Sequence, residues 1–466
     1  MSDALPIYSY ALPVLVAIIA LLSIFLSPKA KTSGAFFSGL SPSGAQPGLW
    51  MLTFSQVTTW IFARSLMNAA ILGFYYGIWG TVAYAAYYLS FLVGGRIIDN
   101  LRFEQGYGSV QSFLKDRFGG WGTRCYNFVV GVRLVSEVFA NLLVIGILFG
   151  VAGSTAYTVA ILAFAAVTLL YSVVGGLHAS LRTDLFQMLI FLGVLVLLVI
   201  MAFTGGQFEF AQLLFKPFNI TEPGPILLLV ALLQVWSYPM HDPVMMDRGF
   251  LADRETTRKS FLHAGWISIT CIMIFGCFGV FAGANVQDGE AMNDVLTRLL
   301  GAAPMLMFNA ALVISAMSTL DSTLSSSAKL VAVDMKVIKP TIDNGRLVML
   351  LFMVLGLGLV FLGNKDLFSA VAVSGTASMY LVPVVFFSLW GKRADIPVWS
   401  YVGSFMLALG GALLYFTESS GHSQILGESH KYTKLLWISL TLMVSCNLLF
   451  WVGAKTSGSA LRPQVA

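Results

Sequence analysis

Residues 237–243 read Ser-Tyr-Pro-Met-His-Asp-Pro, and they lie inside an apolar segment that runs from about 223 to 247. Two prolines four residues apart cannot both lie in an unbroken helix, because each removes a backbone hydrogen bond. Irregular backbone at membrane depth is tolerated only inside protein or against a water-filled cavity. The stretch therefore predicts an interrupted helix deep inside a membrane protein.

The composition of the whole chain agrees with a membrane location. Of 466 residues, 57% are hydrophobic and only 11% are charged, whereas soluble domains carry roughly 25% charged residues. This excludes a soluble enzyme, a nucleic-acid-binding protein and a secreted disulfide scaffold. Four cysteines lie in or beside apolar segments and show no metal-ligand spacing: Cys125, Cys271, Cys277 and Cys446.

Apolar segments long enough to span a bilayer recur along the entire chain. We predict an all-α integral membrane protein with about 13 transmembrane helices, at about 7–27, 48–76, 78–101, 120–150, 155–175, 180–204, 223–247, 259–284, 301–335, 345–363, 366–390, 397–417 and 433–453. No connection between them is long enough to hold a soluble domain.

Lysine and arginine are distributed unevenly over the loops between these segments. Counted in alternate order, one set of loops holds 20 of the 27 basic residues and the other set holds 5, while Arg64 and Arg133 fall inside spans. Because basic residues concentrate in cytoplasmic loops, we expect the N-terminus outside and the C-terminus in the cytoplasm. The expected location is the plasma or inner membrane.

A few charged residues lie within the apolar segments. A charge at mid-bilayer costs at least about 2.5 kcal/mol on insertion scales, so each needs a partner or a watery cavity. Either they converge on one central site, or they form local ion pairs that only lock helices together; Arg133 and Glu137, four residues apart, suit such a pair. The set consists of Arg64, Arg133, Glu137, Asp184, Asp242 and Asp321, with His241 beside them.

Hydroxyl groups are concentrated in the segment Ser-Ala-Met-Ser-Thr-Leu-Asp-Ser-Thr at 315–323. Four of them repeat at helical spacing on one face, and Asp321 adds a carboxylate. Oxygen ligands without soft thiolate or imidazole groups suit a hard monovalent cation. Alternatively, the hydroxyls bond back to their own helix.

Gly-Gly-Leu-His-Ala at 175–179 is followed by Thr-Asp-Leu-Phe-Gln at 183–187. These two stretches resemble the GG-x-x-A…TD-x-x-Q signature of the sodium/solute symporter family, whose members include proline, pantothenate, sialic acid, sugar and urea symporters. Residues 316–322 resemble its sodium-site helix. Asp247-Arg248 with the residues up to Arg258, and Pro383 to Arg393, resemble two further family motifs. The likeness is clearest over 48–395.

The resemblance implies a leucine-transporter-like fold, in which ten core helices form two inverted five-helix repeats. On that template, 1–47 is an extra N-terminal transmembrane helix with a cytoplasmic loop. Residues 48–204 form the first repeat and 205–391 the second. Residues 392–466 supply two peripheral helices and a cytoplasmic tail.

The resemblance also implies where sodium binds. The first site uses the hydroxyls of Ser318 and Thr319 with carbonyls of Ser315, Phe54 and Val57. A second site, found in some members, uses Asp184, Ser318, Asp321 and Ser322. We therefore expect one or two co-transported Na+ ions and no organic cofactor. The first core helix lacks Gly and Pro between Thr53 and Leu72, so its expected break depends on Ser55, Thr58 and Thr59.

For the solute, the arginines are the most informative residues, because a guanidinium binds a carboxylate with two parallel hydrogen bonds. We predict import of a small polar organic solute with a carboxylate, such as an amino acid or organic acid. The predicted solute-binding residues are Gln56, Trp60, Arg64, Asn68, Arg133, Glu137, Tyr238, His241 and Asp242.

Alternatives remain open at this point. A neutral solute such as urea is one, since Ser55-Gln56 and the run from Tyr76 to Ala86 resemble urea-transporting members. Proton coupling through Asp184 or Asp321 is another, and a transporter-like sensor a weaker third. We expect no enzyme activity, because no catalytic motif stands out. The expected partners are the solute and the lipid bilayer, without nucleic acid or an obligatory protein partner.

Overall fold

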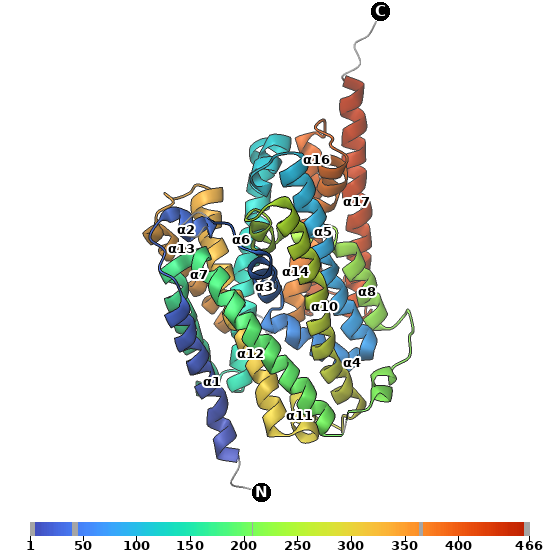
Figure 1. The fold of residues 1–466 in the computed structure, drawn as a ribbon. Helices are drawn as coiled ribbons and strands as arrows, with labels where there is room; N and C mark the ends of the chain where they lie inside the picture. Colours follow the sequence, from blue (N-terminus) through green and yellow to red (C-terminus); the bar gives the residue numbers. More distant parts are fainter. Residues whose placement is uncertain (1–4, 40–44, 207, 363–366, 461–466) are drawn as a thin grey trace, which may run out of the picture.

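The computed structural model describes residues 5–39, 45–206, 208–362 and 367–460, and these are helical wherever they have regular secondary structure. Long helices lie side by side, and α1 begins at the end of the bundle opposite to the one where α17 finishes (Figure 1). Within the described residues, nine helices are long and apolar enough to cross a membrane. The all-α, multi-pass prediction is confirmed, whereas the count of 13 stays a prediction.

The helices in chain order are α1 (Leu5–Leu26), α2 (Ser33–Ser38), α3 (Leu49–Trp60), α4 (Ala63–Ala86), α5 (Ser90–Ile98), α6 (Val110–Phe149), α7 (Thr155–Thr204), α8 (Pro223–Gln234), α9 (Pro243–Arg248), α10 (Arg254–Ala284), α11 (Met292–Leu300), α12 (Ala302–Lys329), α13 (Ile342–Leu362), α14 (Leu367–Ala377), α15 (Leu381–Pro383), α16 (Val398–Ser419) and α17 (Lys431–Ala460). Short 3-10 or π turns are η1 (Tyr87–Leu89), η2 (Asp99–Glu104), η3 (Phe210–Leu214), η4 (Pro239–His241), η5 (Leu330–Asp334), η6 (Ser378–Tyr380) and η7 (Val384–Trp390).

Helix α7 turns back on itself at Gly176, whose φ of 55° is in the left-handed region that favours glycine. A Cβ atom there would lie 2.5 Å from the carbonyl oxygen of Phe36. On one side of the turn, the Tyr171 hydroxyl donates to the carbonyl of Met317 at 2.9 Å. On the other side, Asp184 meets the next residue of α12, Ser318, at 2.6 Å. The turn thus separates the two spans predicted at 155–175 and 180–204.

The span predicted at 48–76 is interrupted between α3 and α4. Ile61 and Phe62 leave helical geometry, with ψ of 66° and 149°. The carbonyl of Trp60 accepts a hydrogen bond from the Tyr88 hydroxyl at 2.7 Å, and that of Ile61 accepts one from the Ser315 hydroxyl. Side chains from other helices therefore satisfy the carbonyls at the break.

The break does not lie at the hydroxyl residues from which we expected it. Thr58 and Thr59 remain inside α3, where their hydroxyls donate to the carbonyls of Phe54 and Gln56 at 2.9 and 3.0 Å. Such bonds keep a hydroxyl within its own helix, so they do not open the backbone.

The second interruption lies in the proline-flanked stretch, as predicted. Helix α8 ends at Gln234, η4 covers Pro239–His241, and α9 starts at Pro243. Asp242 between them is extended (φ −95°, ψ 101°), and its Oδ1 accepts a hydrogen bond from the backbone N–H of Met245 at 3.0 Å. The carboxylate therefore caps α9 and fixes the broken backbone.

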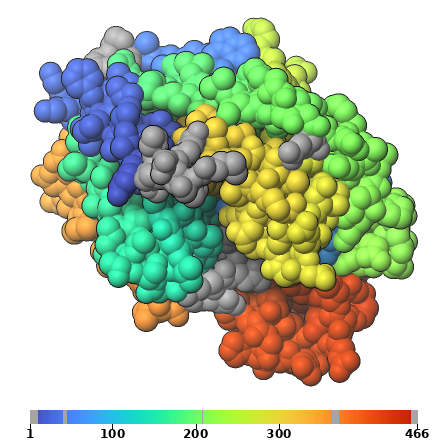
Figure 2. Space-filling view, turned by 90° about the horizontal axis from the view of Figure 1, so that it is seen from below, coloured from blue at the N-terminus to red at the C-terminus, as the bar shows by residue number. Residues whose placement is uncertain are grey.

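Helix α12 occupies the centre of the bundle and is buried along most of its length, against α3, α6 and α7. Helices α16 and α17 pack together at the side of the bundle (Figure 1). Seen from the end where α1 begins, α11 and the start of α12, in yellow, cover the middle of the molecule beside the α6–α7 turn, in teal (Figure 2).

Candidate functional site

A buried polar cluster forms where α3, α7, α9 and α12 meet, and Asp184 is at its centre. The Asp184 carboxylate accepts hydrogen bonds from the hydroxyls of Ser55 and Ser318, both at 2.6 Å, and from Ser322 at 3.3 Å. The Arg248 guanidinium lies 3.6 Å from Asp184 Oδ2 and donates to Ser322 at 2.9 Å. All five side chains are fully buried. We call these residues, together with Asp321, the ion cluster.

Asp321 extends this cluster with a second carboxylate. Its Oδ2 accepts a hydrogen bond from the Thr183 hydroxyl at 2.8 Å, whereas its buried Oδ1 has no hydrogen-bond partner in the part of the chain that is described. No described cationic side chain forms an ion pair with it. The cluster thus holds two carboxylates and one guanidinium, and it has one net negative charge when both carboxylates are ionised.

The residues predicted for the first sodium site come together from α3 and α12. The Thr319 hydroxyl donates to the carbonyl of Thr58 at 3.3 Å and to that of Ser315 at 2.9 Å. The carbonyls of Phe54 and Val57, by contrast, accept local hydrogen bonds. Their donors are the Thr58 hydroxyl at 2.9 Å and the Ile61 backbone N–H at 2.8 Å, respectively. The carbonyls that accept hydrogen bonds from α12 are therefore those of Thr58 in α3 and of Ile61 directly after it.

The second predicted site also assembles, but with an addition that we did not predict. Three of its four residues, Asp184, Ser318 and Ser322, belong to one hydrogen-bonded group. Arg248 inserts into that group from α9. Two features of the sequence could have indicated Arg248. It directly follows the segment interrupted by prolines, and it lies in the stretch that resembles a loop of the family.

A second buried cluster contains two arginines and two carboxylates, and we call it the central cluster. Glu137 Oε1 accepts a hydrogen bond from Arg64 at 2.7 Å and forms an ion pair with Arg133, whose Nη1 also lies 2.7 Å away. Arg133 also donates to Asp242 Oδ2 at 2.6 Å. The four side chains are 1 to 3% exposed and come from α4, α6 and the α8–α9 break. The buried charges thus form two clusters rather than the single site we considered, and the local pairs we considered are present.

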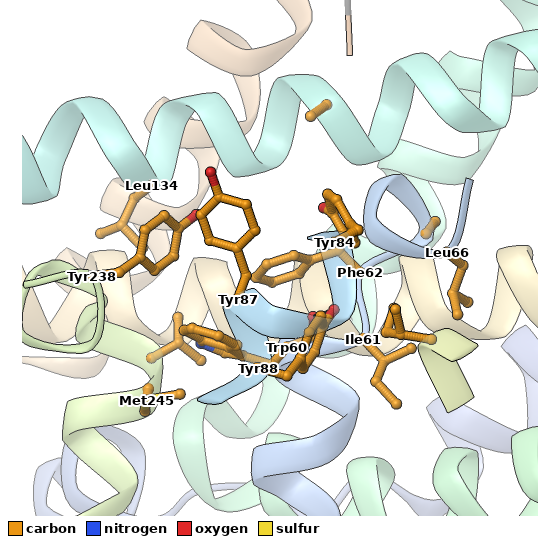
Figure 3. Close-up of a cluster of buried hydrophobic side chains, with 14 of the residues drawn as sticks. Trp60, Ile61, Phe62, Leu66, Tyr84, Tyr87, Tyr88, Leu134, Tyr238 and Met245 are labelled. Atoms are coloured by element: carbon orange, nitrogen blue, oxygen red, sulfur yellow. Dashed lines mark hydrogen bonds between the residues drawn. The ribbon is translucent and has the colours of Figure 1, made fainter. Parts of the chain in front are cut away.

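Aromatic side chains surround the central cluster. The indole N–H of Trp60 donates to Asp242 Oδ2 at 3.1 Å, and Arg133 donates to the Tyr238 hydroxyl at 3.1 Å. The guanidinium carbons of Arg64 and Arg133 lie 5.2 and 5.8 Å from the ring centre of Phe62. Figure 3 shows the Phe62 ring among Trp60 and the nearby tyrosines. Cation–π contact of this kind favours the charged guanidinium in a buried place.

The remaining predicted solute residues lie at the edges of these clusters. Among the described residues, the two amide atoms of Gln56, buried on α3, and Nδ2 of Asn68 on α4 have no hydrogen-bond partner. His241 lies in the break, where its ring nitrogens meet the Tyr238 carbonyl at 2.6 Å and the Ser374 hydroxyl at 3.0 Å. Of these three side chains, His241 is the one whose polar atoms all contact a partner among the described residues.

Helices α3, α4, α6 and α7 supply Ser55 and Asp184 of the ion cluster and three of the four residues of the central cluster, and they lie in the part of the chain that matches a known family. Residues 43–223 match the sodium:solute symporter family. The TD-x-x-Q stretch lies within the matched residues, so the resemblance to this symporter family is confirmed. No protein of curated function matches the chain.

Solved transporter structures share the fold. A Na+-coupled sialic acid symporter in a substrate-bound, outward-open state aligns over 96% of this chain and 98% of its own, with a TM-score of 0.68 and 14% identity. Mhp1, a nucleobase-cation-symport-1 family transporter in a closed conformation with bromovinylhydantoin, aligns over 91% and 97%, with a TM-score of 0.58 and 16% identity. A manganese transporter of Eremococcus coleocola aligns over 93% and 97%, with a TM-score of 0.51 and 10% identity.

The matched family and these neighbours are transporters and not enzymes, in line with the expectation of no enzyme activity. The family match supports sodium-coupled symport as the class of activity.

Proposed function

We propose that this chain is a sodium-coupled symporter that imports a small polar organic solute bearing a carboxylate, by alternating access. The observation that carries the proposal is that two buried carboxylates, those of Asp184 and Asp321, share a single guanidinium, that of Arg248. An isolated buried charge is costly, so one added monovalent cation stabilises this cluster. Hydroxyl and carboxylate oxygens are ligands suited to Na+.

The position of the ion cluster explains how cation binding is coupled to the solute. Ser55 of α3 and Ser318 of α12 both donate to Asp184 of α7, and the interruption of α3 lies within two turns of Ser55, beside Trp60 of the central cluster. A cation that favours one arrangement of α3 against α12 therefore favours one form of the solute site. By linkage, solute binding raises the affinity for the cation by the same factor.

For the solute, we propose contacts with Gln56, Trp60, Arg64, Asn68, Arg133, Glu137, Tyr238, His241 and Asp242. The two arginines supply charge-assisted donors for a carboxylate. Sodium is proposed to bind at Ser315, Ser318 and Thr319 with α3 carbonyls. Solute binding is proposed to close the outer gate, after which two bundles of helices rock to open the site inward. The proposed setting is the plasma or inner membrane, with the C-terminus cytoplasmic.

Protons are the competing coupling ion, because Asp321 Oδ1 is buried and unpaired and a proton bound there supplies the same charge. Purified protein in liposomes distinguishes them, with labelled amino acids, organic acids and urea offered under an imposed Na+ gradient or an imposed pH gradient. We expect accumulation that follows the Na+ gradient and persists when the pH is equal on both sides. Uptake driven by the pH gradient alone, without Na+, would overturn sodium coupling.

A further inference from the structure

The two carboxylates of the central cluster are used to different extents. Asp242 is fully engaged, because Oδ2 accepts from Arg133 and Trp60 while Oδ1 caps α9 at Met245. Glu137 meets both arginines through Oε1, by a hydrogen bond from Arg64 and an ion pair with Arg133, and its buried Oε2 has no hydrogen-bond partner among the described residues. One acceptor oxygen of an ionised carboxylate is therefore available in the centre of the bundle.

The two arginines are unequal as well. Arg133 contacts Glu137, Asp242 and Tyr238, and within the described part of the chain only its Nε has no partner. Arg64 bonds to Glu137 through Nη2 alone, and its buried Nε and Nη1 have no partner within the described ranges. The spare donors of Arg64 and the spare acceptor of Glu137 belong to one ion pair, whose Nη2–Oε1 contact is 2.7 Å.

Buried charged groups with unused hydrogen-bonding atoms are costly unless something binds to them. A solute that satisfies this pair needs a negatively charged acceptor for Arg64 and a positively charged donor for Glu137. Two more unpaired groups, the amide of Gln56 and Nδ2 of Asn68, offer additional polar contacts.

The net charge of each cluster restricts the solute further. The central cluster is neutral, since two guanidiniums face two carboxylates. The ion cluster carries one negative charge and balances one bound cation by itself. The charge of Na+ is then balanced by the ion cluster and cannot compensate an anionic solute. A solute of zero net charge therefore binds without adding an uncompensated buried charge.

From these observations we infer that the solute is a zwitterion, in which a carboxylate binds Arg64 and a protonated amine binds Glu137 Oε2. The inference rests on the proposed symport function and specifies its substrate class. Amino acids belong to this class, whereas organic acids without an amine, and urea, do not. Because the solute is neutral, each cycle moves only the charge of the coupling ion.

The experiment compares solutes that differ in one charge. Liposomes with the full-length protein are offered the labelled standard amino acids, the same acids with an N-acetyl group, and urea, all under one inward Na+ gradient. We expect accumulation of at least one amino acid, and uptake of its N-acetyl derivative at least about tenfold lower, as expected for the loss of a charge-assisted bond. Uptake of N-acetyl acids or urea without uptake of amino acids would overturn the inference, as would failure to bind or transport any amino acid.

The variant Glu137→Gln tests the amine contact itself. It gives the central cluster a net positive charge, so we expect it to lose amino acid uptake by at least about tenfold and to gain binding of the N-acetyl acid. The control is Glu418→Gln, which breaks the pair with Lys434 (2.7 Å) between α16 and α17, away from both clusters, and should retain the preference for amino acids. A misfolded protein cannot gain a new preference, so unchanged selectivity in Glu137→Gln contradicts the inference. Sodium-independent uptake of amino acids would instead contradict the proposed function and leave the zwitterion inference intact.

Discussion

The Arg248 guanidinium lies 3.6 Å from the Asp184 carboxylate, with both side chains fully buried. Arg248 is also 2.9 Å from the Ser322 hydroxyl. The protein thus places its own cation among residues expected to bind a second sodium ion. Since this guanidinium neutralises one carboxylate, the relationship favours one added cation over two.

Replacing Arg248 should therefore change the number of ions transported. Arg248→Gln leaves Asp184 and Asp321 with two negative charges, so we expect the charge moved per solute to rise from one towards two. The reversal potential of solute-dependent current in proteoliposomes measures this ratio. Arg248→Lys retains the charge and should keep the ratio at one. A ratio that is the same in Arg248→Gln and the unaltered protein would contradict the charge balance.

The hydroxyls of α12 should determine the affinity for sodium. We expect Ser318→Ala or Thr319→Ala to raise the Na+ concentration for half-maximal uptake by about tenfold, because a hydrogen bond or contact to a charged group contributes roughly 1.5–3 kcal/mol. Asp184→Asn should abolish sodium-dependent uptake. Cys271→Ala on α10 is the control and should leave the sodium dependence unchanged. If the three site variants had the same sodium affinity as Cys271→Ala, these residues would not form the sodium site.

The hydrogen bond from Ser315 to the carbonyl of Ile61 should stabilise the interruption between α3 and α4. Ser315→Ala leaves a buried carbonyl at the break without this donor, which costs about 1–3 kcal/mol of the free energy of unfolding. Thermal unfolding in detergent measures the loss. Ser136→Ala removes a partly exposed hydroxyl that bonds only to its own helix at Val132, and should change stability by less than about 0.5 kcal/mol. Equal effects of the two substitutions would be inconsistent with a specific role for Ser315.

The turn in α7 depends on glycine at position 176. Gly176→Ala places a Cβ 2.5 Å from the Phe36 carbonyl at a φ of 55°, so we expect a loss of at least about 1–3 kcal/mol of stability. Gly193→Ala lies in the same helix with open space around it and should be neutral or slightly stabilising. Melting temperatures in detergent compare the two. If Gly176→Ala were as stable as Gly193→Ala, the turn would not need glycine.

Some features of this protein follow from the sequence because they arise within a few residues of one segment. Apolar runs predict spanning helices, Pro239 and Pro243 predict the second interruption, and the repeat of hydroxyls on α12 predicts a polar face. Each depends on local backbone chemistry or on helical periodicity, which neighbouring residues specify by themselves.

Other features were decided by tertiary contacts between distant segments. The α3–α4 break has no glycine or proline, and it persists because Tyr88 and Ser315 satisfy the carbonyls there. Arg133 and Asp242, 109 residues apart, form an ion pair in one cluster, while Arg248 joins Asp184 in another. Which buried charges become partners depends on how the helices pack, because ion pairs need contact within a few ångströms, and residue spacing along the chain does not specify that contact.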